Sequence, residues 1–393
     1  MNTTEVRGVL TLNAGSSSLK IAVYALEGDT PILTGQADRI GPSATLALRK
    51  ADGEGIPIAS GDLTTHAGAL GVILETLRAH VPGLSLKAIG HRVVHGGERF
   101  SAPVTLTSEV MDYLSSLEPF APLHQPHNLA GIRMATDAFP SVPQVACFDT
   151  AFHRGHPFVN DSFALPYRYF ENGVRRYGFH GLSYAYISER LRERAPRLAE
   201  GRVVVAHLGN GASMCSILNG QSIASTMGFS ALDGLPMGTR CGQLDPGVLL
   251  YMLDQEKLSP EQIRKVLYSE SGLLGLSNGL SNDMRTLEAS DTPEARRAID
   301  YFVSRIQREL GAMAAAMGGI DALVFCGGIG EHSRLIRARV CERMAWMGIE
   351  LDHSLNQAQA EVISSALART TVMVIPTQEE LVIARAARQA ASL

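Results

Sequence analysis

The chain has 393 residues, and at about 150 residues per domain this length predicts two or three domains. Apolar residues make up 45% of the chain and charged residues 19%, so a sizeable core can be buried. The formal charge of −4, without any block of like charges, argues against a nucleic-acid partner. The five cysteines are scattered singly, no signal peptide is evident, and no apolar run approaches the ~20 residues of a membrane span. We therefore expect a soluble cytoplasmic protein with no membrane partner.

The first half of the chain alternates strand patterns with helix patterns. A buried strand is predicted at 9–13, followed by a turn of small residues and a returning strand at 19–26. Apolar residues with helical spacing run over 64–80. Two further strands are predicted at 87–94 and 144–148, and a helical segment is predicted between them, after Leu123.

The second half opens in the same way as the first. A strand at 202–208 enters a tight glycine turn and returns, and about half the chain length separates Asn210 in this turn from Asn13. A long helix is predicted over 293–317, ahead of a strand at 321–325. These matched units predict an internal duplication, and the fold class is therefore α/β with two similar lobes.

Three glycine-rich turns that follow buried strands are candidate phosphate sites. The turn at 13–20 combines backbone N–H groups, serine hydroxyls and Lys20, while those at 209–211 and 327–331 are rich in glycine. A plain polar turn is the alternative for each one taken alone. None fits GxxxxGK[ST] or GxGxxG, which argues against P-loop and Rossmann folds. Three such turns in a duplicated chain fit an ATP cleft between two lobes.

Two arginines, a histidine and an aspartate are candidate catalytic groups. Arg92 and Arg240 stand among glycines and apolar residues, where a guanidinium suits a carboxylate or phosphate, although a solvated surface arginine is the alternative. Both are expected at loop ends, so that their removal would abolish turnover and leave the fold intact. His180 lies between glycines, and Asp149 follows a strand, where α/β proteins place their chemistry.

The histidines also raise the hypothesis of a metal centre. On a strand, His91 and His95 would lie about 13 Å apart, and no cysteine or carboxylate has the spacing of zinc ligands. We expect core or hydrogen-bonding roles for the three histidine pairs, which are His91/His95, His124/His127 and His153/His156.

Taken together, these segments resemble the acetate kinase family. The resemblance covers essentially the whole chain, and its motifs occur in the order of the family. The matching stretches are LNAGSSSLK (12–20), GHRVVHGGE (90–98), APLHQPHNL (121–129), FDTAFH (148–153), YGFHG (177–181), HLGNGAS (207–213), MGTRCG (237–242), GGIGE (327–331) and PTQEEL (376–381).

The resemblance implies the fold of the sugar kinase/Hsp70/actin superfamily, with the active site in a cleft between two lobes. Residues 1–150 with about 381–393 would form the lobe for the acyl substrate and the phosphates, and 151–380 the nucleotide lobe. The implied protein is a homodimer that transfers the γ-phosphoryl group of ATP to acetate, reversibly and in line, giving acetyl phosphate and ADP. Mg²⁺ would be its cofactor, and Mn²⁺ can substitute. Alternatives are a propionate or butyrate kinase of the same family, or an ATP-hydrolysing switch of the superfamily.

The resemblance also implies residue roles by position. Asn13 and Glu379 would hold the magnesium, and the catalytic set would be Asp149, Arg92, His180 and Arg240. Asp149 would act as the catalytic acid. An alternative role for Asp149 is to position Arg92 or a metal-bound water. Nucleotide and phosphates would contact Ser16, Ser18, Lys20, His207, Leu208, Gly209, Asn210, Gly211, Asp283, Met284, Arg285, Gly328, Ile329, Gly330, Glu331 and His332. The acid would lie against Arg92, Val94, Leu123, Phe179 and Ala231.

The chain departs from the usual family pattern at several positions. His332 stands where the family usually has asparagine, and Ala231 replaces a proline that helps to wall the acyl pocket. Leu182 and Tyr184 replace the threonine and histidine of the usual YGFHGTSH. We expect a roomier pocket that accepts propionate as well as acetate. Because one methylene is worth about 1–3 kcal/mol in such a pocket, the preference for acetate should stay below a few hundredfold.

Overall fold

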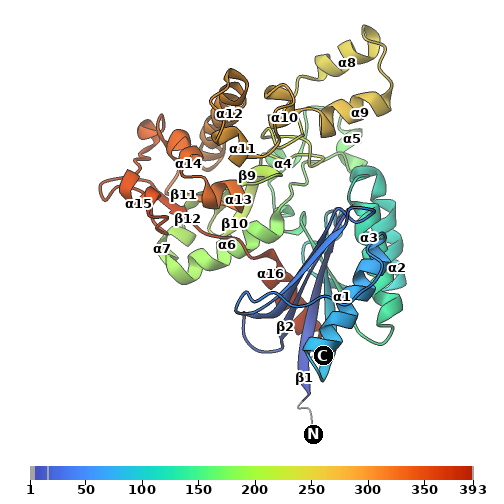
Figure 1. Ribbon diagram of the computed structural model, residues 1–393. Helices are drawn as coiled ribbons and strands as arrows, with labels where there is room; N and C mark the ends of the chain where they lie inside the picture. The colour runs from blue at the N-terminus through green and yellow to red at the C-terminus, as the bar shows by residue number, and fades with distance from the viewer. Residues whose placement is uncertain (1–4, 16, 392–393) are drawn as a thin grey trace. The chain divides into compact units, whose positions relative to one another are not determined.

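The computed structural model describes residues 5–15 and 17–391, and the chain divides into two compact units (Figure 1). The first unit spans Met1–Phe152 and Gln378–Leu393, and the second spans His153–Thr377. Among the described residues, no helix is long and apolar enough to cross a bilayer. Ser16, which was predicted to meet phosphates, lies outside the described residues.

The first unit is built on a seven-stranded sheet with the order β4-β3-β2-β1-β5-β7-β6. β1 pairs antiparallel with β2 and parallel with β5, and β5 runs parallel to β7. The strands are β1 (Val6–Ala14), β2 (Ser18–Ala25), β3 (Pro31–Asp38), β4 (Thr45–Lys50), β5 (Leu84–Val93), β6 (Val104–Thr105) and β7 (Gln144–Phe148).

Helices cover both faces of this sheet. The C-terminal helix α16 (Glu379–Ala391) packs on β5 and β1, where Gly90 leaves room for it, since a Cβ there would lie 2.5 Å from Ile383. The opposite face is covered by α3 (Gln125–Ala138), whose Gly131 lies against Leu12 and Ala14. The remaining helices of this unit are α1 (His66–His80), α2 (Ser108–Ser116) and η1 (Glu118–Phe120), and η2 (Ala151–His153) spans the point where the units divide.

The second unit contains a five-stranded sheet with the order β10-β9-β8-β11-β12. β8 pairs antiparallel with β9 and parallel with β11, β9 pairs antiparallel with β10, and β11 runs parallel to β12. In the first unit, β3-β2-β1-β5-β7 have this same order and these same directions, which is the repeat expected from a duplicated chain. The strands are β8 (Arg202–Leu208), β9 (Ala212–Leu218), β10 (Gln221–Ser225), β11 (Ala322–Cys326) and β12 (Thr371–Val374).

Two long helices lie on opposite faces of this second sheet (Figure 1). Ser216 of β9 donates a hydrogen bond to the Met313 carbonyl of α12 (Pro293–Met317). Ser213 projects from the other face of β9 and meets Tyr184 of α6 (Gly181–Arg194). The other helices are α4 (Phe158–Asp161), α5 (Arg168–Glu171), α7 (Pro196–Ala199), α8 (Pro246–Asp254), α9 (Pro260–Ser269), α10 (Gly272–Leu276), α11 (Met284–Glu288), α13 (Gly327–His332), α14 (Arg334–Cys341), η3 (Ala345–Met347) and α15 (His353–Gln357).

Candidate active site

Three parallel strands of the first unit carry candidate residues to one edge of the sheet. Asn13 lies at the end of β1, Arg92 near the end of β5, and Asp149 directly after β7. Because side chains alternate between the faces of a strand, the pairing registers place all three on the face that α16 covers. Glu379 is the first residue of α16, so the strand ends and the helix start bring four predicted residues to one region of this unit.

Arg92 is the centre of this group. Its Nε donates to Asp149 Oδ1 at 3.0 Å and its Nη2 donates to Asp149 Oδ2 at 2.7 Å. This is the bidentate geometry common in arginine–carboxylate pairs. Its Nη1 lies 3.1 Å from Glu379 Oε2. One guanidinium therefore contacts two carboxylates, and the group as a whole carries an excess negative charge.

Burial acts on both partners of the Arg92–Asp149 pair. Burial raises the pKa of Asp149, Arg92 opposes this effect, and the charge of Glu379 adds to it. Burial alone would lower the pKa of Arg92, but the charges of Asp149 and Glu379 raise it above its usual value. Arg92 therefore stays cationic, and Asp149 takes up a proton more readily than an ordinary aspartate.

The other predicted residues of the first unit lie around this group or farther along the chain. Lys20 pairs with Asn13 across β1 and β2, is exposed, and lies on the same face of the sheet. Ser18 opens β2, and its carbonyl accepts a hydrogen bond from the Gly15 N–H. Val94 is buried, and its backbone N–H donates a hydrogen bond to Asn128 Oδ1, whereas Leu123 is exposed.

His180 and Arg240 lie close to each other in the second unit. A Cβ placed on Gly211 would lie 3.1 Å from both His180 Nε2 and Arg240 Nη2, so the two groups converge on the glycine turn after β8. His207 stacks on His180, with ring centroids 4.2 Å apart. Arg240 Nη1 donates to the Ala231 carbonyl at 2.6 Å, so Ala231 meets Arg240 through its backbone.

The loop that carries His180 has an unusual backbone. Gly178 has φ 72° and His180 has φ 56°, the left-handed region that residues with a Cβ rarely adopt. Phe179 lies between these two residues, and its carbonyl accepts a hydrogen bond from His153 Nε2 at 2.9 Å. The His153 ring also fills the space beside Gly178. The buried His153 therefore supports the loop, and the Phe179 side chain is itself buried.

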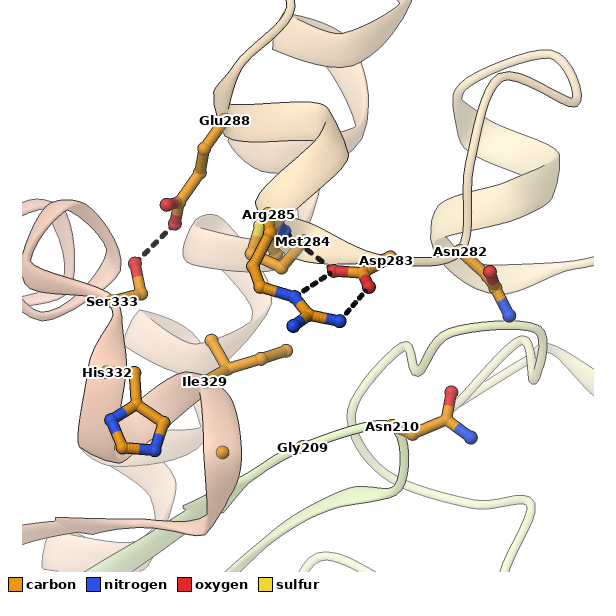
Figure 2. Close-up of a pocket in the computed structure, with 11 residues that line it drawn as sticks. Gly209, Asn210, Asn282, Asp283, Met284, Arg285, Glu288, Ile329, His332 and Ser333 are labelled. Atoms are coloured by element: carbon orange, nitrogen blue, oxygen red, sulfur yellow. Dashed lines mark hydrogen bonds and ion pairs between the residues drawn. The ribbon is translucent and has the colours of Figure 1, made fainter. Parts of the chain in front are cut away.

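A cavity of about 500 Å³ opens beside the first turn of α13 in the second unit (Figure 2). Arg285 bends back onto Asp283 in a bidentate ion pair, with Nη2 and Oδ2 2.5 Å apart. Glu288, from the same helix α11, accepts a hydrogen bond from Ser333. Eight residues predicted to bind nucleotide line the cavity: Gly209, Asn210, Asp283, Met284, Arg285, Gly328, Ile329 and His332.

Five other residues predicted for the nucleotide have different places in this unit. Glu331 Oε1 accepts from the Gly327 N–H at 2.9 Å and the Thr377 N–H at 3.1 Å, so it caps the start of α13. The Gly330 carbonyl accepts from the buried Arg337, and Leu208 is buried at the end of β8. His207 and Gly211 lie on the His180 side of the turn.

Three residues that line the cavity did not stand out in the sequence: Asn282, Glu288 and Ser333. Asn282 directly precedes Asp283, so a wider window around that residue would have included it. Glu288 and Ser333 belong to helices far apart in the chain, α11 and the start of α14, and only the folded unit places them together.

The sequence matches the profile of the acetokinase family over residues 8–385. The chain belongs to this family. It is 59% identical to the acetate kinase of Methylocella silvestris, with 96% of each chain covered, and 50% identical to that of Nitrobacter hamburgensis, with 96% of this chain and 94% of the relative covered. As a member of the acetokinase family, the protein is a kinase.

Solved structures show the same fold. A propionate kinase from Francisella tularensis superposes with a TM-score of 0.91 at 35% identity, covering 98% of this chain and 99% of that one. The acetate kinase of Porphyromonas gingivalis gives a TM-score of 0.88 at 38% identity, with the same coverage. The fold is therefore that of the acetokinases, as expected from the sequence.

The histidines of two predicted pairs, His91/His95 and His153/His156, make side-chain hydrogen bonds. His91 Nε2 lies 2.6 Å from Gln144 Oε1, and His95 Nδ1 accepts from the Gly97 N–H. His153 and His156 share the hydroxyl of Ser222, at 2.8 and 2.7 Å. The ring of His127 stacks on that of His66. Within 5–15 and 17–391, no three His, Cys, Asp or Glu residues are grouped so that they could hold a metal ion.

Proposed function

We propose that this protein transfers the γ-phosphoryl group of ATP to acetate, reversibly and by direct in-line attack, giving acetyl phosphate and ADP. The observation that carries the proposal is the cavity of the second unit, because eight residues chosen for nucleotide from the family motifs line it together. The alternative acceptors are propionate and butyrate, which need the same chemistry.

The proposed reaction must bring one anion to another. Acetate is already ionised at neutral pH, because carboxyl groups titrate near ~4, so deprotonating it is no obstacle. Two unit charges 4 Å apart repel by about 4 kcal/mol at an effective dielectric constant near 20. Lys20, Arg92, His180 and Arg240 are the groups that would offset this repulsion, and a well-placed arginine can be worth about 10³–10⁵ in the rate of phosphoryl transfer.

In this proposal the first unit serves the acid and the phosphates. Arg92 would hold the carboxylate of acetate in addition to its two protein carboxylates. Asp149 would keep Arg92 oriented, or exchange a proton with a bound water, and its raised pKa suits such an exchange. Ser18 and Lys20 would meet phosphate oxygens from the start of β2, and Ser16 is proposed to contact phosphate as well.

The same region suits a magnesium ion. The Arg92 group carries one positive and two negative charges, and without further positive charge it would repel an incoming carboxylate. Asn13 and Glu379 offer oxygen atoms, and Mg²⁺ is commonly held by one or two protein oxygens while it keeps several waters. When bound, the ion would neutralise phosphate charge, and Mn²⁺ can substitute because it prefers the same ligands.

In the second unit the nucleotide would occupy the cavity beside α13. The turn from Gly209 to Gly211 would approach the phosphates with its backbone, because it has few side-chain atoms in the way. Asp283, Met284 and Arg285 would line one wall, and Gly328, Ile329 and His332 the other. His180 and Arg240 would stabilise the charge that develops on the phosphoryl group in transit.

The acyl tail would lie against Val94, Leu123, Phe179 and Ala231. Ala231 offers a methyl group where a proline ring is usual, so a longer tail has more room. The structural likeness to a propionate kinase is consistent with propionate as a second substrate. Because one methylene changes binding by about 1–3 kcal/mol, we expect kcat/KM for acetate and propionate to differ by less than a few hundredfold.

We also propose that the protein is a homodimer in the cytoplasm. Every described residue of α8 is at least partly exposed, although its sequence is PGVLLYMLD. Leu250, Tyr251 and Leu253 are 59%, 55% and 40% exposed, and such an apolar surface is typical of an interface. Changing Leu250 and Tyr251 to glutamate should convert a dimer to a monomer in light scattering, whereas a wild-type monomer would refute the proposal.

The reaction can be tested with hydroxylamine, which traps acyl phosphates. Protein mixed with Mg-ATP, acetate and hydroxylamine should form acetyl hydroxamate at a rate that rises with acetate. Release of ADP that does not depend on acetate would instead indicate an ATP-hydrolysing switch. Parallel reactions with propionate and butyrate would rank the acceptors.

A further inference from the structure

Ser213 connects His180 to Tyr184 inside the second unit. Its Oγ lies 2.9 Å from His180 Nδ1 and 2.5 Å from Tyr184 Oη. Ser213 comes from β9, and Tyr184 lies one helical turn after His180 in α6. Ser213 and Tyr184 are fully buried, so bulk water does not compete for these hydrogen bonds.

The donors and acceptors of this chain can be assigned by counting protons. Ser213 has one hydroxyl proton and can donate it to only one of its two neighbours. If Ser213 donated to Tyr184, the buried phenol proton would need another acceptor. Among the described residues, Ser213 Oγ is the hydrogen-bond partner of Tyr184 Oη, and leaving a buried donor unpaired carries a free-energy cost. Tyr184 therefore donates to Ser213. The buried Ser213 hydroxyl needs an acceptor for its own proton, and His180 Nδ1 is its remaining partner among the described residues, so Ser213 donates to His180 Nδ1.

Two further observations support this direction. Burial raises the pKa of Tyr184 well above its usual value, so the phenol remains a donor across the working pH range. The ring of His207 stacks on the ring of His180 and limits the rotation that would exchange its two nitrogens. A tyrosine has one hydroxyl proton to give, whereas the histidine usual at this position in the family could present either of two ring nitrogens.

We propose that Tyr184 is a positioning residue that acts through Ser213 to hold neutral His180 as the tautomer with its proton on Nε2. Nε2 is the nitrogen that converges with Arg240 Nη2 on Gly211. The proton is thus held where His180 can donate a hydrogen bond to an oxygen of the phosphoryl group in transit. That last step rests on the proposed function, but the tautomer does not.

The tautomer can be read directly by NMR. In unliganded protein labelled with ¹⁵N-histidine, the two ring nitrogens of His180 have distinct shifts, and a His180→Gln variant assigns them. We expect a protonated Nε2 and an unprotonated Nδ1, with the other tautomer below about a tenth of the population, since one hydrogen bond is worth about tenfold. A proton mainly on Nδ1 in the wild-type protein overturns the proposal, and this result needs no variant to fold.

Variants separate positioning from simple stability. Tyr184→Phe keeps the ring and removes the donor, so both tautomers of His180 should become populated within about threefold of each other. We expect kcat to fall about five- to tenfold, with KM for ATP and acetate within about twofold. Tyr177→Phe is the matched control, because it removes another buried tyrosine hydrogen bond, to the Gly173 carbonyl, and should leave the tautomer unchanged.

A double variant completes the test. Ser213→Ala should cause the same loss of kcat as Tyr184→Phe, and the two together should cause no more, because Tyr184 acts only through Ser213. Additive losses would refute this path. If the tautomer shifts in Tyr184→Phe but the wild-type protein forms no acetyl phosphate, the proposed function fails and the positioning role stands.

Discussion

Arg92 of β5 forms a bidentate ion pair, with N–O distances of 3.0 and 2.7 Å, with Asp149, which directly follows the adjacent parallel strand β7. From the sequence, Arg92 was expected at a loop end, where its removal would leave the fold intact. The loop-end placement is wrong, because Arg92 is the penultimate residue of β5 and the partner of a carboxylate that is 2% exposed. Removing only the arginine would leave a buried charge unpaired, which typically costs about 3–5 kcal/mol.

Arg92→Lys is therefore a better test of function than Arg92→Ala. Lysine keeps the positive charge but cannot make two parallel hydrogen bonds to Asp149 while it also contacts Glu379. We expect kcat/KM for acetate to fall by about 10² or more, with a melting temperature close to that of the wild type. The control is Arg99→Lys, since the pair of Arg99 with Glu109 is exposed. An Arg92→Lys variant of wild-type activity would show that the bidentate geometry is irrelevant.

Gly178→Ala tests whether His153 supports the loop that carries His180. A Cβ at this position would lie 2.7 Å from the His153 ring, and φ is 72°. Strain of about 1–3 kcal/mol should displace the loop and lower kcat by at least about tenfold. Gly71→Ala is the control, because nothing lies within 4 Å of a Cβ there and alanine should stabilise α1 by up to ~1 kcal/mol. Equal activity of both variants would contradict the role given to His153.

Buried histidines predict how stability depends on pH. Burial lowers the pKa of His91 and of His153 to about 4 and that of His156 to about 2. These groups are neutral in the folded chain but take up protons near pH 6.5 when it unfolds, so lowering the pH favours unfolding.

The free energy of unfolding should therefore fall as the pH drops from about 7 towards 4, by up to about 1.4 kcal/mol per pH unit for each histidine. Urea titrations at several pH values would measure this slope. His91→Gln removes one of the three groups that take up a proton on unfolding, so it should reduce the slope by the contribution of that one group. A free energy that stays constant over this range would contradict the neutral state of the three histidines.

Gly328→Leu tests the cavity of the second unit. Nothing lies within 4 Å of a Cβ at Gly328, and its φ is not positive, so a side chain is tolerated there but enters the cavity. We expect the Kd for ATP to rise at least about tenfold in calorimetry, while the melting temperature changes by only a few degrees. Unchanged ATP affinity would place the nucleotide elsewhere.

Much of the fold could be predicted from the sequence because its signals are local. The long helix spans 293–317, as its pattern predicts, and the structure adds a Thr292 cap before it and Gly318 with φ 70° after it. The repeated strand–turn–strand units also predicted two sheets of common topology. Family motifs supplied the candidate site residues.

What the sequence did not show depends on contacts between distant segments. The pairing of Glu288 with Ser333 joins residues far apart in the chain. The capping role of Glu331 depends on the Thr377 N–H as well as on its own helix. The path from Tyr184 through Ser213 to His180 needs a helix and a strand packed together, and no spacing of residues along the chain reveals it.

The most direct test of the account follows phosphorus in a single reaction. Protein, Mg-ATP and ¹⁸O-labelled acetate are mixed, and ³¹P NMR records the products over time. Attack by the acetate carboxylate on the γ-phosphorus predicts equal amounts of ADP and acetyl phosphate, with one ¹⁸O bonded to the phosphorus of the latter. ADP and inorganic phosphate formed without acetyl phosphate, at a rate indifferent to acetate, would contradict it.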